Sequence, residues 1–474
     1  MNKPQNIRLG GCSVMKRSKG PRQLHNLPSS SKINWSKYKQ KNYLHFDERI
    51  KVQHMKTKIQ DSKWVASYAF LPSIHFEIVF KKYVTITEID DQGKKSRRKK
   101  KKEKVREIFY AAHKDSYIYK YYGDLLNDAY NKYAKKNGID EIAVAYRNNK
   151  KGKNSVDFAY EVFEHLMKQQ SAVVISMDFT SFFDNISHKT LKQNIKRVLH
   201  VESLSDDWYK VFRNLTKYTY VNKSDVDEFL KNRYGVKQLK KMRPSKIMEP
   251  HEFRKFKKDH LHVNKKQFGI PQGSGMSAVC SNVHLIDFDK EIREWAIEKH
   301  ENALYRRYCD DLILVIPVST QGIDTFHVIR DELLDIVYKY KKDGLHIQNE
   351  KTEIRLYKNG EILNEQLEPA TLDYLGFVTN GKNIRLREKS LFNYYSRAYR
   401  KAKTSKLISL ATKRPGPKKQ LYNLYTHLGH RYKGYGNFVS YAYKAHRKMN
   451  QLSSHSLVRR QVKRHWYKVH KRLK

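Results

Sequence analysis

Runs of apolar residues in the middle of the chain predict both strands and helices. Residues 172–177 (AVVISM) and 312–316 (LILVI) are continuous apolar runs that predict strands. Together with the residues before it, the second run predicts a hairpin over residues 303–318. After Ser277, apolar residues recur at helical spacing, at Val279, Val283, Ile286, Ile292 and Trp295. These segments predict an α+β layered domain.

The segments on either side have different patterns. Residues 83–89 and 105–110 predict the two strands of a long hairpin, because a turn signal (DDQG) and the basic block of residues 94–102 separate them. We expect its tip to be a flexible, solvated loop. Residues 389–474 carry apolar residues at helical spacing, and a Pro-Gly-Pro sequence at residues 415–417 predicts a break between helices.

Two further segments are strongly charged. Residues 1 to about 40 are basic and loop-like, which fits either a disordered tail or an arm that becomes ordered on RNA. Residues 200–262 separate the first predicted strand from the later motifs. We interpret them as an insertion without an assigned role.

Three acidic residues lie at the ends of the predicted strands. Asp178 follows the first run, and Asp310 and Asp311 belong to the sequence YCDD at the turn of the hairpin. Neighbouring carboxylates repel each other and are costly to bury, but a hard divalent cation neutralises them. A solvated turn, or a helix N-cap for Asp178, would explain each acid alone. The three together predict a two-metal site that clamps the oxygens of an in-line displacement.

Five short motifs follow one another along the chain. They are DFTSFFD (178–184), FGIPQGS (268–274) followed by Ser277 and Asn282, YCDD (308–311), LHIQNEKT (345–352) and DYLGF (373–377). In this order they resemble the motifs of reverse transcriptases, in the bacterial lineage that includes group II intron and retron enzymes. The resemblance implies a right-hand polymerase fold with fingers, a palm made of an antiparallel sheet and helices, and a helical thumb.

Softer similarities indicate a subfamily. The sequences YLHFD (43–47), AFLP (69–72), REIFYAAH (106–113) with Asp115 and Ser116, and IAVAYR (142–147) resemble defence-associated reverse transcriptases, the abortive-infection or "unknown group" enzymes. The match is to class 2, class 9 or a neighbouring class. It implies RNA-directed DNA synthesis on a structured non-coding RNA template in antiphage defence.

The resemblance also implies domain boundaries. A basic N-terminal extension (1–40) precedes the fingers (41–154), and the palm (155–380) contains the charged insertion at about 200–262. The basic helical thumb then spans residues 381–474.

Metal ligands follow from the same resemblance. Asp178 and Asp310 are expected to bind metal directly, Asp311 to assist them, and Phe179 to add a backbone carbonyl. The expected cofactor is a pair of Mg²⁺ ions, with Mn²⁺ as a substitute. Lys351, in the Lys-Thr pair, is expected to protonate the departing pyrophosphate.

The incoming nucleotide has its own expected contacts. Arg106 matches the fingers arginine that grips the triphosphate through its bidentate fork, with Lys104 as a companion. A plain contact with a phosphate backbone is the alternative for Arg106. Gln272 is expected beside the nucleotide, where Gly273 allows a close backbone approach. Gly275 stands where the family usually has Pro, which places the template contact there in doubt.

Sugar selection is assigned to one of two adjacent rings. Phe183 matches the bulky side chain that would collide with a ribose 2′-hydroxyl and so favour dNTPs. Phe182 competes for this role, and one of the two rings should point into the core. The residues expected at the primer or template are Tyr308, Tyr374, Leu375, Gly376 and Arg147, the last with a contact inside the fingers as its alternative.

Composition indicates the partner. The chain has 96 Lys and Arg against 48 Asp and Glu, a net charge of +48, and this imbalance implies a polyanion. A membrane is disfavoured, because the sequence contains no apolar run of about 18 residues. We therefore expect a non-coding RNA, a DNA product and dNTPs as partners, and leave a homo-oligomer open.

The cysteines and the N-terminus bear on location. Cys12, Cys280 and Cys309 form neither a disulfide framework nor zinc-type spacing, and the first 30 residues have no apolar core of a secretory signal. We expect a cytoplasmic protein.

From Lys389 to the last residue there is no Asp or Glu. A cationic helical face with interleaved aromatics can follow phosphates and stack on bases. The alternative is that the aromatic side chains simply pack in the core of the thumb. Arg459, Arg460, Lys463 and Arg464 are predicted to contact RNA from one helix.

Two other functions remain open from sequence. The first is a retron or group II intron-type reverse transcriptase, although no zinc-type endonuclease motif follows the thumb. The second is a non-catalytic RNA-binding protein on a polymerase fold. The three acids argue against it, because binding alone does not require converging carboxylates.

Overall fold

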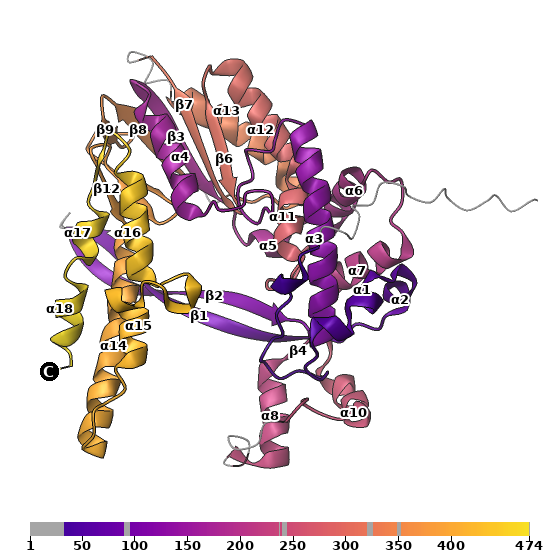
Figure 1. Cartoon of the computed structure of the whole chain (residues 1–474). Coiled ribbons are helices and arrows are strands. Elements are labelled where there is room, and N and C mark those ends of the chain that lie inside the picture. Colours follow the sequence, from indigo (N-terminus) through magenta and orange to yellow (C-terminus); the bar gives the residue numbers. More distant parts are fainter. Residues whose placement is uncertain are drawn as a thin grey trace, which may run out of the picture.

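The computed structural model describes residues 33–89, 95–236, 238, 244–319, 326–347 and 352–473, without the side chains of residues 81–102. The described residues form helices and three sheets (Figure 1), and the α+β fold class is confirmed. In the described part of the chain, no helix combines the length and apolar composition needed to cross a membrane.

A five-stranded antiparallel sheet lies at the centre of the palm. Its strands, in spatial order, are β6 (Leu304–Tyr308), β7 (Asp311–Pro317), β3 (Ser171–Asp178), β8 (Glu353–Lys358) and β9 (Glu361–Leu363). β3 and β7 match the two apolar runs. These strands are apolar throughout because both faces of the sheet are covered. Val173 and Ile175 of β3 enter one hydrophobic core, and Ala172 and Val174 enter another.

The larger core is shared by the palm and the fingers. It lies against β3 and β7 and extends into α3 (His113–Lys136), a mostly buried helix. The other helices that contribute buried residues to this core are α1 (Lys56–Gln60), α2 (Ser62–Ser67), α5 (Phe182–Asn185), α6 (His188–Leu199), α7 (Asp206–Thr216), α11 (Ser277–His284), α12 (Ile286–Lys299) and α13 (Phe326–Lys339). Three 3₁₀ turns accompany them: η2 (Trp35–Lys37), η3 (Val52–His54) and η5 (Tyr340–Asp343).

The second core joins the other face of the palm sheet to the C-terminal region. It includes α4 (Ser155–Met167), α16 (Phe438–Met449) and α17 (Val458–Val462). A small sheet also contributes, with the strand order β10 (Leu372–Tyr374), β11 (Phe377–Thr379), β12 (Asn383–Leu386) and β13 (His455–Ser456). The last strand pairs parallel with β12, so the chain returns from the thumb to this sheet.

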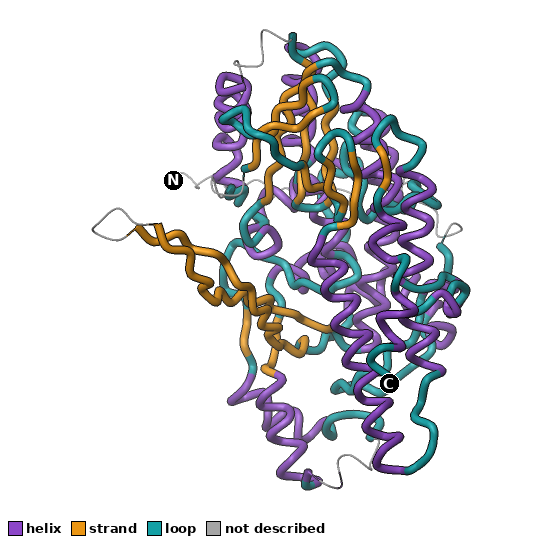
Figure 2. The backbone as a smooth tube through the Cα atoms, turned by 90° about the vertical axis from the view of Figure 1, so that its left-hand side faces the viewer, coloured by secondary structure: helices purple, strands orange, loops and turns teal. Residues whose placement is uncertain are grey.

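The predicted hairpin of the fingers is confirmed and is longer than its apolar residues indicated. β1 (Ser73–Ile89) and β2 (Lys95–Tyr110) pair antiparallel from Ile74 opposite Tyr110 to Ile89 opposite Lys95. Figure 2 shows this two-stranded ribbon projecting from the body of the molecule. Its tip, residues 90–94, lies outside the described residues.

The charged segment 200–262 is built into the fingers and the main core. Trp208, Val211 and Leu215 of α7 are buried in the larger core. β4 (Thr219–Asn222) then pairs parallel with β1, and β5 (His262–Val263) pairs with β4. Between these strands lie α8 (Lys223–Tyr234) and α10 (Pro250–His260), whose apolar residues form a satellite core with Phe46 and Ile74. The segment predicted as an insertion is therefore packed against the rest of the protein, and its role stays unassigned.

The C-terminal helices form a small core of their own. α14 (Glu388–Thr412), α15 (Lys419–Tyr425) and α18 (His465–His470) pack around Ala398, Ala402, Leu421 and Val469. The predicted break at residues 415–417 is confirmed, because these residues lie in the loop between α14 and α15. Two 3₁₀ turns, η7 (His427–Gly429) and η8 (Tyr432–Gly434), lead into α16.

Candidate active site

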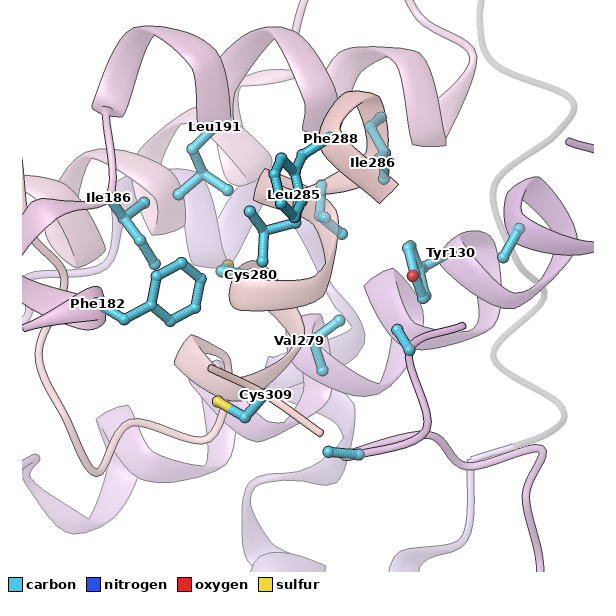
Figure 3. Close-up of a cluster of buried hydrophobic side chains, with 14 of the residues drawn as sticks. Tyr130, Phe182, Ile186, Leu191, Val279, Cys280, Leu285, Ile286, Phe288 and Cys309 are labelled. Atoms are coloured by element: carbon cyan, nitrogen blue, oxygen red, sulfur yellow. The ribbon is translucent and has the colours of Figure 1, made fainter. Parts of the chain in front are cut away.

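The YCDD sequence forms a two-residue turn between β6 and β7. Tyr308 pairs with Asp311, which leaves Cys309 and Asp310 at the tip. Cys309 has a φ of 62°, a left-handed conformation that a side chain adopts only at a cost of about 1 kcal/mol or more. Its thiol is buried 3.9 Å from the Ser281 hydroxyl, and this burial raises its pKa to about 12. Figure 3 shows Cys309 at the edge of the main core.

The register of the sheet brings the third acid to this turn. Asp178, the last residue of β3, lies directly opposite Asp311, the first residue of β7. Residues directly opposite in an antiparallel pair project from the same face, with Cβ atoms about 4.5–5.5 Å apart. Asp178, Asp310 and Asp311 are therefore neighbours, as the sequence predicted.

Burial and the neighbouring acids both raise the pKa of Asp310 and of Asp311. Burial raises the pKa of Asp310, and the charge of Asp178 adds to the effect. The pKa of Asp311 rises to about 6, first because surrounding protein displaces water and then because Asp310 and Asp178 lie nearby. Lys104 of β2 opposes the shift at Asp310, and Arg387 opposes it at Asp311.

The donor set fits a hard divalent cation by its chemistry. Among the described residues, no three His, Cys, Asp or Glu side chains are placed as a formed metal site. The three carboxylates nevertheless offer only oxygen donors, and burial together with neighbouring acids raises the pKa of Asp310 and of Asp311, a penalty on negative charge that a divalent cation would relieve. Asp178, Asp310 and Asp311 would hold such an ion. Phe179, the residue after Asp178, is buried, and its backbone forms an isolated antiparallel β-bridge with Ile347.

A buried ion pair holds the turn from behind. The guanidinium of Arg307 donates to Asp289 of α12 through Nε, at 2.8 Å, and Nη2, at 2.6 Å, and both side chains are fully buried. Its remaining Nη1 donates to the Cys309 carbonyl at 2.8 Å and to Asn282 Oδ1 at 3.2 Å. Burial alone would lower the pKa of Arg307, but Asp289 outweighs it and raises that pKa.

Arg307 also connects this turn to the fingers. Its backbone N–H donates to the Ile142 carbonyl at 2.8 Å, and its carbonyl accepts from the Val144 N–H at 3.0 Å. Asn282 donates to the Ala145 carbonyl at 2.9 Å. Arg307 and Asp289 were not among the site residues predicted from sequence. The available signal was an arginine placed at a core-facing position of a strand that ends in YCDD.

The two phenylalanines after Asp178 differ in burial. Phe182 is 3% exposed and points into the main core near Ile186 and Cys280 (Figure 3), whereas Phe183 is half-buried. Ser181, before them, has a φ of 47° and begins the short helix α5. This arrangement agrees with the expectation that one ring enters the core, and leaves Phe183 as the more exposed ring of the two.

The PQG loop is held between the palm and the fingers. The Ile270 N–H donates to the Phe183 carbonyl at 2.9 Å, and the Phe109 N–H of β2 donates to the Gln272 carbonyl at 3.0 Å. Gly273 has a φ of 113°, and a Cβ there would lie 2.6 Å from the Phe109 carbonyl oxygen. The close approach that this glycine permits is therefore to β2 of the chain itself.

Gly275 has a comparable packing role. A Cβ at Gly275 would lie 3.0 Å from the Cα of Lys120, and one at Gly123 would lie 2.7 Å from the Gly275 carbonyl oxygen. The pair allows the backbone of the loop to lie against α3. The residue that departs from the family pattern is thus part of a tight contact.

Lys104 and Arg106 lie on the described part of β2 and are exposed. Lys104 is close enough to Asp310 to affect its pKa, so the hairpin passes near the carboxylates. The guanidinium of Arg106 lies 5.3 Å from the centre of the Phe80 ring on β1. Lys351 falls outside the described residues.

The DYLGF motif forms a second tight turn. Tyr374 pairs with Phe377, and Leu375 and Gly376 between them have φ values of 46° and 88°, as a type I′ hairpin turn requires. Tyr374 is 4% exposed, and burial and the charge of Asp311 raise its pKa. Asp373 forms a 2.5 Å ion pair with Arg387, which places the turn beside the acids. Tyr308 is half-buried.

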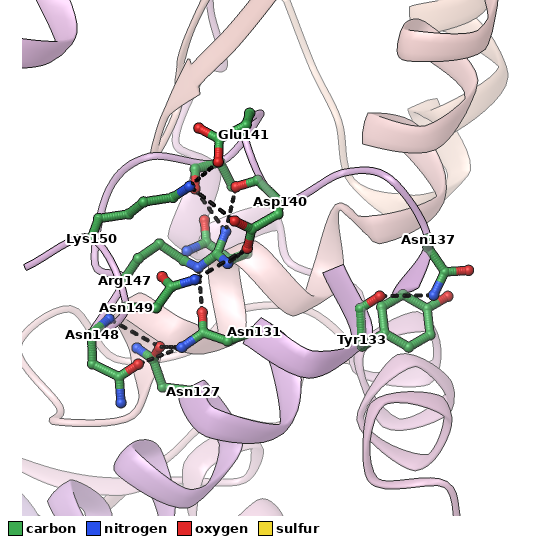
Figure 4. A network of polar contacts seen from close by, with 12 residues as sticks. Asn127, Asn131, Tyr133, Asn137, Asp140, Glu141, Arg147, Asn148, Asn149 and Lys150 are labelled. Atoms are coloured by element: carbon green, nitrogen blue, oxygen red, sulfur yellow. Dashed lines mark hydrogen bonds and ion pairs between the residues drawn. The ribbon is translucent and has the colours of Figure 1, made fainter. Parts of the chain in front are cut away.

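Arg147 does not face a template. Its guanidinium is buried and donates to Asn131 Oδ1, to the carbonyls of Asp140 and Ala143, and to the Asp140 carboxylate (Figure 4). Every polar nitrogen of the group thus has a partner within the fingers. The template contact predicted for Arg147 is wrong, and its alternative, a contact inside the fingers, describes the structure.

The four predicted RNA-contacting cations are exposed but do not share one helix. Arg459 and Arg460 belong to α17, whereas Lys463 and Arg464 form the turn before α18. The single helix expected here is wrong, because the chain turns between two buried residues, Val462 and His465.

Comparison with known proteins gives one family. The sequence model described as "Reverse transcriptase (RNA-dependent DNA polymerase)" matches residues 99–379. No curated protein matches the chain.

Similar solved structures include two telomerases. The apo enzyme from Candida tropicalis, truncated from its C-terminal domain, is 15% identical with a TM-score of 0.37, over 69% of this chain and 59% of that one. The enzyme from Candida albicans, in complex with a fragment of telomeric RNA, is 12% identical with a TM-score of 0.39, over 87% and 65%. The chain thus spans less than two thirds of either protein.

Removing one partner of the buried ion pair should destabilise the protein strongly. Asp289→Asn leaves the Arg307 charge buried without its counter-ion, so we expect a loss of about 3–5 kcal/mol in the free energy of unfolding. Urea unfolding measures it. The double variant Arg307→Met/Asp289→Leu buries no unpaired charge and should recover part of the loss.

An exposed pair on the same helix provides the control. Asp287 of α12 binds Arg197 in a bidentate pair at 2.6 and 2.7 Å, but both side chains are more than one third exposed. Asp287→Asn should therefore cost no more than about 1 kcal/mol. Equal losses for Asp287→Asn and Asp289→Asn would contradict the special role of the buried pair.

Proposed function

Because the chain belongs to the reverse transcriptase family, we propose that it copies a structured non-coding RNA into DNA in antiphage defence. The family match covers more than half of the chain and makes the protein an RNA-directed DNA polymerase, a nucleotidyltransferase. The observation that carries the proposal is the meeting of Asp178, Asp310 and Asp311 at one end of the palm sheet.

These carboxylates are proposed to hold two Mg²⁺ ions, for which Mn²⁺ would substitute. Asp178 and Asp310 bind directly, Asp311 assists, and the Phe179 carbonyl completes the protein's share of ligands. Bound divalent ions would supply positive charge at the attacking and leaving oxygens. The protein positions the primer 3′-hydroxyl in line with the α-phosphate of the dNTP, and pyrophosphate leaves as the new phosphodiester bond forms.

The surroundings of the acids provide contacts for the nucleotide. Lys104 and Arg106 of β2 are proposed to bind the triphosphate, and the position of Lys104 near Asp310 supports this assignment. Gln272 lies beside the nucleotide, in a loop fastened to both β2 and Phe183. Phe183 selects against the ribose 2′-hydroxyl, and Lys351 donates a proton to pyrophosphate.

The primer end is assigned to the DYLGF turn. Leu375 and Gly376 form its tip, next to the ion pair of Asp373 with Arg387. Tyr374 is buried, so we propose that it supports the turn and that its neighbours contact the primer. Tyr308 lies between this region and the fingers, with its ring 6.5 Å from that of Tyr146.

The defence assignment rests on segments that meet in the fingers. Asp47 of YLHFD accepts hydrogen bonds from the backbone N–H groups of His113 and Lys114, both at 2.9 Å. Asp115 accepts from the Leu71 N–H at 3.0 Å and the Tyr68 hydroxyl at 2.8 Å. Three of the four segments that resemble defence-associated enzymes thus pack around the start of α3, which supports treating them as one shared feature.

The template is proposed to be a non-coding RNA that also serves as a scaffold. The net charge of +48 and the absence of acids from residue 389 onward support a polyanionic partner. The cytoplasmic location, the exact defence class and a homo-oligomeric state stay predictions from sequence.

Replacing both Asp310 and Asp311 with Ala should abolish DNA synthesis while RNA binding and thermal stability are kept. The two acids repel each other in the free protein, so their loss does not weaken the fold. Primer extension with Mg²⁺, and with EDTA as the metal-free reference, measures the effect. Asp331→Ala/Asp335→Ala on the exposed face of α13 is the control and should extend normally. Normal extension by the first variant would refute the mechanism.

Phe183→Val should raise incorporation of rNTPs relative to dNTPs, because a smaller side chain leaves room for the 2′-hydroxyl. Competition between the two nucleotide classes in primer extension measures the ratio. Phe182→Val mainly creates a cavity in the core, so it should cost stability and leave the ratio unchanged. A changed ratio in Phe182→Val alone would reverse the assignment of the rings.

Reversing the charges of Arg459, Arg460, Lys463 and Arg464 to Glu should weaken RNA binding and reduce its salt dependence. Each lost phosphate contact reduces the slope of log K against log salt by roughly 0.7 on a single strand. Filter binding over a salt series measures the slope. The control reverses four exposed cations of α10, Arg254, Lys255, Lys257 and Lys258, which changes the net charge equally. Identical slopes in both variants would show that only net charge matters.

A further inference from the structure

The thumb contains a pocket that the proposed reaction does not use. It has a volume of about 350 Å³ and lies between one face of α14 and the loop of residues 432–438. Ser390, Asn393 and Arg397 line it from α14, and Tyr432, Lys433 and Tyr435 line it from the loop. The volume lies near the lower end of the range for small-molecule sites, about 300–1,000 Å³, and suits a single nucleotide better than a duplex.

The floor of the pocket is aromatic and fixed. The rings of Tyr394 and Phe438 stack at a centroid distance of 4.6 Å, and the Tyr394 hydroxyl donates to the Tyr425 carbonyl at 2.6 Å. Tyr394 is 5% exposed, so its ring cannot turn aside without opening the thumb. The rim carries a different aromatic residue, Tyr435, which is 80% exposed.

The backbone of the loop has an unusual conformation. Lys433, Gly434 and Gly436 have φ values of 54°, 83° and 84°, and the value at Lys433 is unfavourable for a residue with a side chain. Asn437 anchors the end of the loop, because its side-chain amide donates to the carbonyls of Asn423 and Thr426 and its oxygen caps α16. The exposed tyrosine is thus presented by a preformed loop.

The charge around the pocket selects an anionic ligand. Arg397 and Lys433 stand at its edge, and no acid occurs from residue 389 to the end of the chain. A flat aromatic surface with cations beside it and no carboxylates is the chemistry that stacks an unpaired base and holds its phosphates. A paired base could not enter, because both of its faces are covered within the duplex.

We propose that this pocket binds one unpaired nucleotide of a single-stranded nucleic acid, with its base stacked on Tyr435 and its phosphates near Arg397 and Lys433. The inference rests on the proposed function, in which the chain handles an RNA with single-stranded parts. α14 begins next to Arg387, which binds the DYLGF turn, and Arg397 lies about 15 Å further along this helix. The pocket therefore holds a nucleotide beyond the primer end and outside the catalytic cleft.

Tyr435→Ala in the full-length protein tests the proposal. Binding is measured by fluorescence anisotropy with a single-stranded RNA, a single-stranded DNA of the same sequence, and a blunt RNA–DNA duplex. We expect the Kd for single strands to rise by about five- to a hundred-fold, from the loss of one stacked base, and the Kd for the duplex to stay unchanged. A fluorescent adenine analogue placed along the strand should be quenched at one position by the wild type and not by the variant.

Three further variants sharpen the test. Tyr435→Phe keeps the ring and should bind as the wild type does, and Arg397→Gln should reduce the salt slope by roughly 0.7 through one lost phosphate. Tyr338→Ala removes a tyrosine that is 52% exposed on α13, far along the chain from the thumb, and should change nothing. A loss with RNA alone, or with both single strands, supports the pocket and shows whether the 2′-hydroxyl is also bound.

Two results would overturn the proposal. Unchanged single-strand binding by Tyr435→Ala would show that the ring is only solvated. An equal loss on the duplex would show that the loop contacts a phosphate backbone and binds no base. Primer extension by the wild type on an annealed substrate is measured separately, so that failure of the polymerase function is distinguishable from failure of the pocket.

Discussion

The buried pair of Arg307 and Asp289 is the interaction on which the candidate active site depends. Removing two charges from water costs several kcal/mol per ion, and only complete pairing offsets it. Here the guanidinium binds both carboxylate oxygens, the Cys309 carbonyl and Asn282, and Asp289 also accepts from the Tyr305 hydroxyl at 2.8 Å. This interaction fixes a turn that would otherwise relax, since it contains a left-handed Cys309 and two adjacent acids.

On the opposite face of the turn, the negative charges of Asp310 and Asp311 are only partly compensated by cations. Arg307 binds groups on the core side of the turn. Lys104 lowers the raised pKa of Asp310 and Arg387 lowers that of Asp311, but neither restores the ordinary value. Arg387 is itself paired with Asp373. In a chain with twice as many basic as acidic residues, a cluster of acids that keeps its repulsion is unusual, and it is what a cation-dependent reaction requires.

Local sequence patterns predicted many of the helices and strands, but they did not predict contacts between residues that are far apart in the sequence. The strand ending at Asp178, the YCDD hairpin and the helix after Ser277 follow from apolar runs and spacing that neighbouring residues determine. Arg147 was misassigned because its partners, Asn131 and Asp140, are ordinary surface residue types in the sequence. The packing of residues 206–216 was not predicted, because their charged neighbours in the sequence concealed Trp208 and Leu215, which are buried.

The division of the hydrophobic cores determines where this molecule can move at least cost. Fingers and palm share one core, and the PQG loop is hydrogen-bonded to both, so the two regions are held together as one unit. α14, α15 and α18 have a small core of their own. Moving this unit would disturb local contacts such as the Tyr394–Phe438 stack and the hydrogen bonds of Asn437, whereas moving the fingers would break the main core. The joint lies where α14 begins, at Arg387, so a change in thumb position would be felt first at the DYLGF turn and Asp311.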